Sequence, residues 1–169
     1  MKVFGLAGWS GSGKTSLIIR LLPTLNRRGL KVSTIKHAHH RFDVDKPGKD
    51  SWRHREAGAT EVLISSRNRW ALMHENKTDS EARLDDLIAR LSPVDLVLVE
   101  GFKNEPHDKL EVYRAELGKP LIQPEDSNIV AVASDSTLDS LTVPCLDLND
   151  TDAIVRYILD HCQLAEQAA

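Results

Sequence analysis

The pattern of apolar and polar positions predicts strands and helices that alternate along most of the chain. Residues 3–7 form a short apolar run, and the segment from Ser16 to Arg28 carries leucine and isoleucine at helical spacing. The run Asp95–Val99 is almost continuously apolar, as is typical of a central strand in a parallel sheet. Further strands are predicted at 31–36, 60–65, 70–74, 110–113, 129–133 and 143–148.

Capping residues and glycines predict where the other helices begin and end. These helices run from the cap Asp50-Ser51 to Ala57, from the cap Asp79 to Leu91, and from Asn149 or Asp150 to about Cys162. Strands that alternate with helices indicate a three-layer α/β domain, in which helices flank a mostly parallel central sheet. The strands at 60–65 and 70–74 would add a β-hairpin to this domain.

One segment between the first strand and the first helix predicts a specific chemistry. Residues 8–15 read Gly-Trp-Ser-Gly-Ser-Gly-Lys-Thr, which matches the phosphate-binding loop of P-loop NTPases. Glycines let the backbone N–H groups turn inward, and the helix that follows adds its own free N–H groups. Lys14 would neutralise the β- and γ-phosphates, and Thr15 would coordinate Mg²⁺. The predicted nucleotide contacts are Gly8, Ser10, Gly11, Ser12, Gly13, Lys14, Thr15 and Ser16.

Glu100 and Gly101 follow the most apolar strand directly. Ligands of open α/β sheets bind at the carboxyl ends of the strands, so both residues are expected in the site. The Glu100 carboxylate would hold Mg²⁺ together with Thr15, or orient an attacking water. Lys14 and Glu100 are therefore the predicted catalytic residues, and Gly101 would allow the backbone to approach a phosphate closely.

The segment 36–55 is a second candidate region because its charge differs from that of the whole chain. It holds six Lys or Arg and three Asp, which gives +3 within a chain of net charge -3. Such a patch suits a second phosphate-bearing ligand. Its predicted contacts are Lys36, His37, Lys46 and Lys49, with Asp43 as a further metal ligand. The histidines His37, His39 and His40 leave open a transition-metal site instead.

Two segments compete for recognition of the base. Residues 76–79 read Asn-Lys-Thr-Asp, the pattern with which many GTPases bind guanine. This segment precedes the Glu100 strand, whereas GTPases place the pattern after that strand, and Asp79 is expected to cap a helix. Ser134 and Asp135, which follow a late strand, are the preferred prediction for the base contact.

Composition narrows the class of protein. A length of 169 residues predicts a single domain, 1–169, and a pI of about 6.2 argues against a general nucleic-acid binder. Apolar runs are too short for a membrane span, and a strand-like start predicts that no signal peptide precedes it. Cys145 and Cys162 are interpreted as reduced thiols of a cytoplasmic protein. Trp9 is a candidate for stacking on a ligand, while Trp52 and Trp70 are predicted in the core or an interface.

Several motifs together resemble one known family. They are the phosphate loop at 8–15, Ile-Lys-His-Ala-His-His at 35–40, Asp-Val-Asp-Lys-Pro-Gly-Lys-Asp-Ser at 43–51, Arg-Trp-Ala-Leu-Met at 69–73, Leu-Val-Glu-Gly-Phe-Lys at 98–103 and Ile-Val-Ala-Val-Ala-Ser-Asp at 129–135. This combination is similar to the molybdopterin-guanine dinucleotide biosynthesis adapter family, MobB. Many families share the phosphate loop, but the motif at 43–51 combined with Glu-Gly-Phe-Lys is far more specific.

The resemblance implies a function as well as a fold. Members of the family bind GTP with Mg²⁺, hydrolyse it slowly and form homodimers. They assist the guanylyltransferase MobA, which joins GMP to molybdopterin to form the dinucleotide cofactor. Carried onto this chain, residues 8–16 would hold the phosphates, and the segment 36–49 would face the molybdopterin cofactor or the partner. The hairpin at 60–74 is a candidate for the dimer contact.

Two alternatives remain open on the residues alone. A small-molecule kinase would use the same phosphate loop with an arginine-bearing lid, for which Arg53, Arg55, Arg67 and Arg69 are candidates. A metal-insertion GTPase would use the histidine-rich segment instead. The preferred interpretation is a homodimeric GTP-binding adapter with weak GTPase activity.

Overall fold

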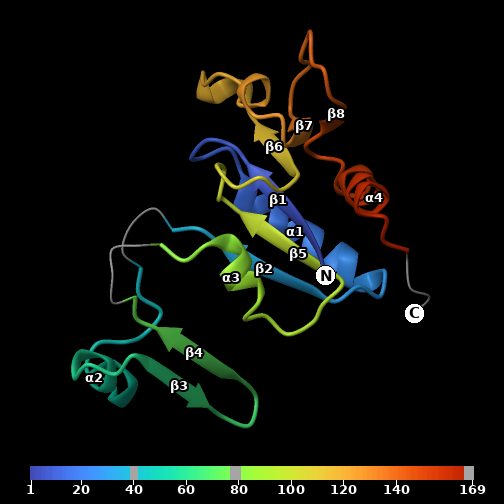
Figure 1. Cartoon of the computed structure of the whole chain (residues 1–169). Helices are drawn as coiled ribbons and strands as arrows, with labels where there is room; N and C mark the ends of the chain where they lie inside the picture. Colours follow the sequence, from blue (N-terminus) through green and yellow to red (C-terminus); the bar gives the residue numbers. More distant parts are fainter. Residues whose placement is uncertain (39–41, 77–80, 166–169) are drawn as a thin grey trace. The chain divides into compact units, whose positions relative to one another are not determined.

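The computed structural model describes residues 1–38, 42–76 and 81–165 (Figure 1). The chain divides into two compact units. The first is built from residues 1–37 and 84–169, and the second from residues 38–83. That residues 1–169 form a single domain stays a prediction.

The larger unit is organised around a six-stranded sheet in which every neighbouring pair is parallel. Its order is β2-β5-β1-β6-β7-β8, which confirms the predicted parallel sheet. The strands are β1 (Lys2–Ala7), β2 (Val32–Lys36), β5 (Leu96–Glu100), β6 (Lys109–Tyr113), β7 (Ile129–Ser134) and β8 (Cys145–Asp147). Because all six run in one direction, the segments after them share one edge of the sheet.

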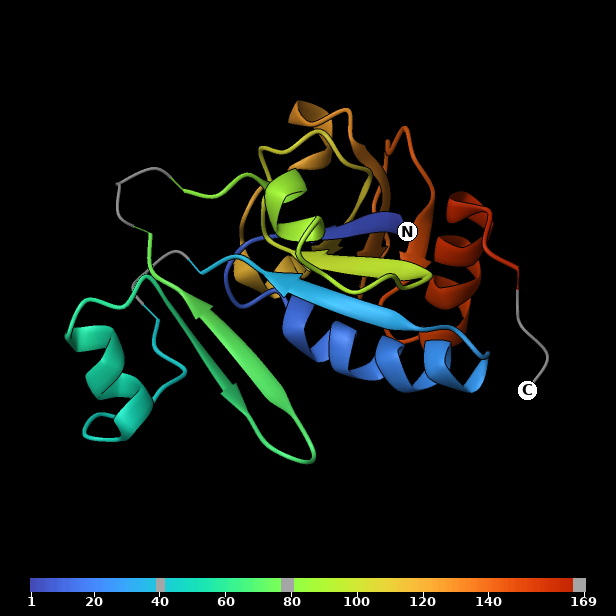
Figure 2. The same cartoon turned by 60° about the horizontal axis from the view of Figure 1, so that its bottom comes forward.

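Two helices, α1 (Lys14–Arg27) and α4 (Thr151–Cys162), cover the same face of this sheet (Figure 2). Leu17 and Leu21 of α1 and Ile158 of α4 are fully buried in the main apolar cluster. Each such side chain contributes about 1.5–3 kcal/mol by leaving water. The Asp150 carboxylate accepts a hydrogen bond from the Ala153 N–H at 2.8 Å, so the predicted cap of the last helix is confirmed.

The opposite face is covered by shorter elements. Helix α3 (Leu84–Ile88) packs Leu84 against Val97 and Val99 of β5. The longer helix predicted up to Leu91 is wrong, because the N–H groups of Arg90 and Leu91 bond three residues back rather than four, which ends the regular helix. The predicted cap Asp79 lies outside the described residues. Two 3₁₀ turns, η1 (Ala115–Leu117) and η2 (Gln123–Glu125), lie between β6 and β7.

The smaller unit holds helix α2 (Asp50–Glu56) and the antiparallel hairpin of β3 (Glu61–Ser65) and β4 (Trp70–His74). The hairpin is confirmed, and its turn is closed by the Ser66 N–H donating to the Arg69 carbonyl at 2.9 Å. The predicted cap of α2 is wrong by one residue: Lys49 stands at the cap position, without a side-chain capping bond. Trp70 is 63% exposed, so it is not a core residue of this chain.

Candidate functional site

The phosphate loop joins β1 to α1 in a conformation that requires glycine. Gly8, Gly11 and Gly13 have φ values of 139°, 84° and 97°. A Cβ on Gly8 would lie 2.5 Å from the Val112 carbonyl oxygen and 2.7 Å from Ser12 Oγ. The predicted order of strand, glycine loop and helix is therefore present, and the loop is compact rather than extended.

Lys14, the first residue of α1, folds its side chain back onto this loop. Its Nζ donates to the carbonyl oxygens of Gly8 at 2.8 Å and Trp9 at 2.9 Å. Burial lowers the pKa of the Lys14 ammonium; the Glu100 carboxylate raises it, and the Lys36 charge lowers it. An ammonium has three N–H donors, so it can hold these carbonyls and still donate to an anion in the loop.

Thr15, Glu100 and Lys36 meet beside the phosphate loop. Thr15 Oγ1 donates to Glu100 Oε1 at 2.7 Å. Lys36 Nζ lies 3.2 Å from the same carboxylate oxygen and 3.3 Å from Thr15 Oγ1. A hydroxyl and a carboxylate oxygen in contact suit Mg²⁺, which binds one or two protein oxygens together with phosphate and water. The Lys36 ammonium lies beside both oxygens, as expected for a position that favours positive charge.

The ends of β2 and β5 bring the other predicted residues to the same edge of the sheet. Lys36 is paired with Glu100 in the strand register, and the His37 N–H donates to the Glu100 carbonyl at 2.8 Å. Gly101 has a φ of 92°, and a Cβ there would lie 2.8 Å from His37 Cβ. The His37 ring packs on Phe102 with ring centroids 4.7 Å apart. His37 therefore fills the space that the missing side chain of Gly101 leaves.

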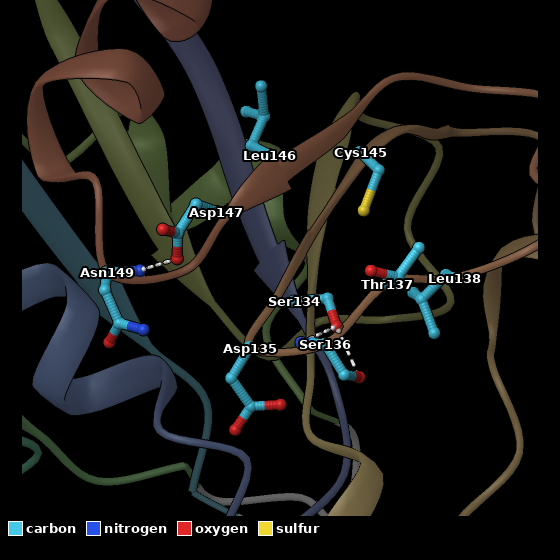
Figure 3. A pocket seen from close by; sticks show the side chains of 9 residues that line it. All are labelled: Ser134, Asp135, Ser136, Thr137, Leu138, Cys145, Leu146, Asp147 and Asn149. Atoms are coloured by element: carbon cyan, nitrogen blue, oxygen red, sulfur yellow. Dashed lines mark hydrogen bonds between the residues drawn. The ribbon is translucent and has the colours of Figure 1, made fainter.

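A cavity of about 470 Å³ lies beyond the carboxyl ends of β7 and β8 (Figure 3). Its volume is within the range of small-molecule sites, about 300–1,000 Å³. Its lining comes from residues 134–138 and from residues 145–147 with Asn149, and it includes both predicted base contacts, Ser134 and Asp135. Figure 3 shows the Asp135 carboxylate and the Asn149 amide extending from the segments after these strands. The Ser134 Oγ accepts the Ser136 N–H at 3.1 Å, which shapes the turn.

Arg114 connects this cavity to the phosphate loop, and the sequence reasoning did not find it. Its Nε donates to the Ser12 carbonyl at 3.2 Å, and its Nη1 to Asp135 Oδ2 at 2.8 Å. Its position in the sequence could have indicated a role in the site, because Arg114 is the first residue after β6 just as Asp135 is the first after β7. The rule that ligands bind at the carboxyl ends of strands applies to all of them.

Trp9 anchors the outer turn of the phosphate loop. Its indole Nε1 donates to the Pro120 carbonyl at 2.8 Å. Lys103 Nζ and Lys119 Nζ lie 5.7 and 5.9 Å from the ring centroid. These distances are typical of cation–π contacts. Two lysines that the sequence reasoning also missed are thus held beside the phosphate loop.

The remaining predicted residues belong to the 38–83 unit. Asp43 Oδ2 pairs with Arg55 Nη2 at 2.8 Å, and this hydrogen bond lowers the pKa of the Asp43 carboxyl. Lys46 and Lys49 are exposed. The roles proposed for Asp43, Lys46 and Lys49 stay predictions.

The transition-metal alternative concerns residues that the structure covers only in part. His39 and His40 lie outside the described residues. In the described ranges, no group of three or more His, Cys, Asp or Glu is arranged to hold a metal ion. His37, the remaining histidine of that set, packs on Phe102.

Comparison with known proteins identifies the family. The model of MobB, molybdopterin guanine dinucleotide synthesis protein B, matches residues 3–135. The chain belongs to the MobB family. The molybdopterin-guanine dinucleotide biosynthesis adapter protein of Escherichia coli (strain K12) is 43% identical over 164 residues, which covers 95% of this chain and 93% of that protein. The protein of the same description from Haemophilus influenzae is 45% identical over 159 residues, covering 92% and 86%.

Solved structures of the family agree with the fold. The crystal structure of molybdopterin-guanine biosynthesis protein B (mobB) superposes with a TM-score of 0.75 at 29% identity, covering 94% of this chain and 99% of that one. A MobB homologue from Bacillus stearothermophilus superposes with a TM-score of 0.70 at 26% identity, covering 98% and 100%. The resemblance noted in the sequence and the P-loop NTPase-like fold are thereby confirmed. The kinase and metal-insertion alternatives are not favoured.

Proposed function

We propose that this MobB-family chain is an adapter of molybdopterin-guanine dinucleotide biosynthesis that binds GTP together with Mg²⁺. The observation that carries the proposal is the contact of Thr15 Oγ1 with Glu100 Oε1, 2.7 Å, beside a glycine-rich loop closed by Lys14. A glycine-rich loop, its lysine and the following hydroxyl are the parts from which nucleoside triphosphate sites of this type are built, which supports the proposal. Family membership supports the adapter role.

Each residue of the site has a proposed task. The backbone N–H groups of residues 8–16 and the Lys14 ammonium bind the phosphates. Mg²⁺, held by Thr15 and Glu100, would neutralise the charge between the β- and γ-phosphates. Lys36 would move from the Glu100 carboxylate to a phosphate oxygen, since both groups are anionic and the lysine side chain is flexible.

Hydrolysis by this site is proposed to be weak. Glu100 Oε1 already accepts from Thr15 and pairs with Lys36, so this carboxylate is engaged in holding cations rather than in activating water. Positioning and charge neutralisation remain as contributions to phosphoryl transfer. Slow hydrolysis suits an adapter, because an adapter acts while its nucleotide is bound and does not need to release a reaction product.

The proposed partners follow from the family. They are molybdopterin or its guanine dinucleotide, the guanylyltransferase MobA and a second copy of this chain. The hairpin β3–β4 exposes Leu63, Ile64, Trp70 and Leu72, which supports its use as the homodimer contact. No helix in the described parts of the chain has the length and apolar character that crossing a bilayer requires. A cytoplasmic location is proposed from the two free thiols, Cys145 and Cys162.

Titration calorimetry with GTP and Mg²⁺ tests the proposal. The variant Lys14→Ala is expected to lose measurable binding, because the phosphates lose the half-buried cation of the loop. Lys31→Ala is the matched control, since it removes an exposed lysine just before β2, at the amino end of that strand. GTP affinity in Lys14→Ala equal to that of Lys31→Ala would refute the site.

A further inference from the structure

Arg114, which no part of the proposed function uses, lies between the phosphate loop and the cavity beyond the carboxyl ends of β7 and β8. We propose that Arg114 is a positioning residue that holds the Asp135 carboxylate for recognition of guanine and ties it to the phosphate loop. This inference rests on the proposed binding of GTP. It assigns nucleotide selectivity to a pair of residues, rather than to Asp135 alone.

The topology of the sheet places Arg114 where it can connect the two parts of the site. In the order β1-β6-β7, the phosphate loop follows β1, Arg114 follows β6 and Asp135 follows β7. The register pairs Tyr113 with Ser134, the residues directly before Arg114 and Asp135. Arg114 and Asp135 therefore start from neighbouring positions at the same sheet edge.

The contacts of Arg114 use the shape of its guanidinium. The Nε donates to the Ser12 carbonyl at 3.2 Å while Nη1 donates to Asp135 Oδ2 at 2.8 Å. A planar guanidinium spans two acceptors with fixed geometry, whereas a lysine ammonium is a single point of charge on a flexible stem. A Cβ on Gly13 would lie 3.5 Å from Arg114 Nε, so the loop backbone approaches the arginine closely. The side chains of Arg114 and Asp135 are 30% and 24% exposed, so their ion pair is partly shielded from water.

The chemistry of the base explains why the orientation of Asp135 matters. An ionised carboxylate only accepts hydrogen bonds, and guanine presents two adjacent donors, N1–H and the 2-amino group. Adenine presents the acceptor N1 at the corresponding place, which faces a carboxylate unfavourably. Arg114 bonds the carboxylate through Oδ2 at 2.8 Å and so restricts its rotation. A carboxylate free to rotate would lose alignment with both donors of guanine.

A positioning role and a direct phosphate contact predict different outcomes. If Arg114 bound a phosphate itself, its removal would weaken the binding of GTP and of ATP by the same factor. If it acts through Asp135, its removal weakens GTP and leaves ATP nearly unchanged. The quantity to measure is thus the ratio of the ATP and GTP dissociation constants.

Titration calorimetry on the full chain with Mg²⁺ and each of GTP, ATP and xanthosine triphosphate makes this measurement. Arg114→Met is expected to lower the ratio about tenfold, the loss of one oriented charge-assisted hydrogen bond. Arg114→Lys is expected to lower the ratio almost as much as Arg114→Met, because a lysine ammonium cannot span both acceptors. Asp135→Asn should lower GTP affinity about 10- to 100-fold and improve binding of xanthosine triphosphate, whose 2-carbonyl accepts from the new amide.

The double variant Arg114→Met with Asp135→Asn gives the decisive result. Because Arg114 acts through Asp135, the double variant should show the same ratio as Asp135→Asn alone. Arg28→Met is the matched control: it removes an arginine paired with Asp152 at 3.2 Å, outside the site, and should change neither affinity.

The outcomes separate this inference from the proposed function. Equal weakening of GTP and ATP by Arg114→Met, or an unchanged ratio, overturns the positioning role while leaving GTP binding in place. Absence of GTP binding by the unmodified chain overturns both. Circular dichroism melts of each variant establish that it is folded, and Arg114→Lys carries the comparison should Arg114→Met lose its cooperative transition.

Discussion

The two compact units of the chain are stabilised by different means. The larger unit buries three apolar clusters around its sheet, and the interior strand β5 is buried at every position. Within the described residues of the 38–83 unit, Val62 is the only buried hydrophobic side chain. Leu63 and Trp70 of its hairpin are 60% and 63% exposed.

Polar pairs hold the smaller unit in place of a core. Arg55 bonds Asp43 at 2.8 Å and Glu75 at 3.4 Å, and His74 Nδ1 lies 2.8 Å from Glu61 Oε1. A lone two-stranded hairpin is marginal in water, so these contacts and α2 supplement a weak element. The larger unit is therefore stabilised by its own core, whereas the smaller one presents apolar surface that a second molecule can cover.

The largest expected loss of folding stability comes from breaking a buried ion pair in the larger unit. Lys109 is fully buried, and its Nζ lies 3.1 Å from Asp126 Oδ2. Asp126→Ala would leave this ammonium without its anion, which costs about 3–5 kcal/mol. Chemical denaturation measures the loss. The control Glu61→Ala breaks the exposed pair with His74 and should cost less than about 1 kcal/mol. Equal losses would remove the distinction between the units.

A leucine deleted from each unit tests the same contrast through packing. Leu98 is fully buried in β5, whereas Leu72 in β4 is 42% exposed. Leu98→Ala is expected to cost about 2–5 kcal/mol because it leaves a cavity. Leu72→Ala should stay within about 0.5 kcal/mol, as is usual for surface positions. Urea unfolding monitored by circular dichroism compares the two, and a cost of Leu72→Ala near that of Leu98→Ala would contradict the comparison.

His107 predicts how the larger unit responds to acid. Burial and the nearby Lys109 charge lower the pKa of His107 from 6.5 to about 4, against the opposing carboxylates of Asp126 and Asp108. Both ring nitrogens are buried, and neither has a hydrogen-bond partner among the residues that the structure describes.

The unfolded chain binds a proton at this histidine below pH 6.5, and the folded chain binds one only near pH 4. The free energy of unfolding therefore falls as the pH drops through this window, by up to about 3 kcal/mol. His107→Leu should flatten the fall in melting temperature between these limits. His54→Gln, at an exposed histidine of α2, is the control, and a fall just as steep in His107→Leu would rule out this cause.

The smallest effect on folding, but the clearest on assembly, is expected in the hairpin. Leu63 and Leu72 are paired across β3 and β4, so their side chains share one face with Trp70. The double variant Leu63→Ser with Leu72→Ser should leave the melting temperature of the monomer almost unchanged. It should shift a homodimer toward monomer in sedimentation velocity. A dimer that persists at the same concentration would place the contact between copies elsewhere.

Local patterns along the chain were sufficient to predict most of the helices and strands and the phosphate loop. The β-hairpin, the central strand β5 and the Asp150 cap were all predicted, because apolar periodicity and caps act within a few residues. The third helix was predicted too long, since apolar spacing continues to Leu91 after the helical hydrogen bonds have ended. The exposure of Trp70 could not be predicted, because tryptophan occurs both in cores and at interfaces, and its neighbours in sequence do not show which of the two applies.

By itself, the sequence determined that a glycine loop lies between a strand and a helix, for which phosphate binding is predicted, and it made Thr15 and Glu100 the candidate metal ligands. Only the tertiary structure decided that Arg114 touches both Ser12 and Asp135, and that Lys36 sits on the Thr15–Glu100 pair. The reason is physical. A loop motif is made by neighbouring residues, whereas the order of strands in a sheet sets which distant residues share an edge.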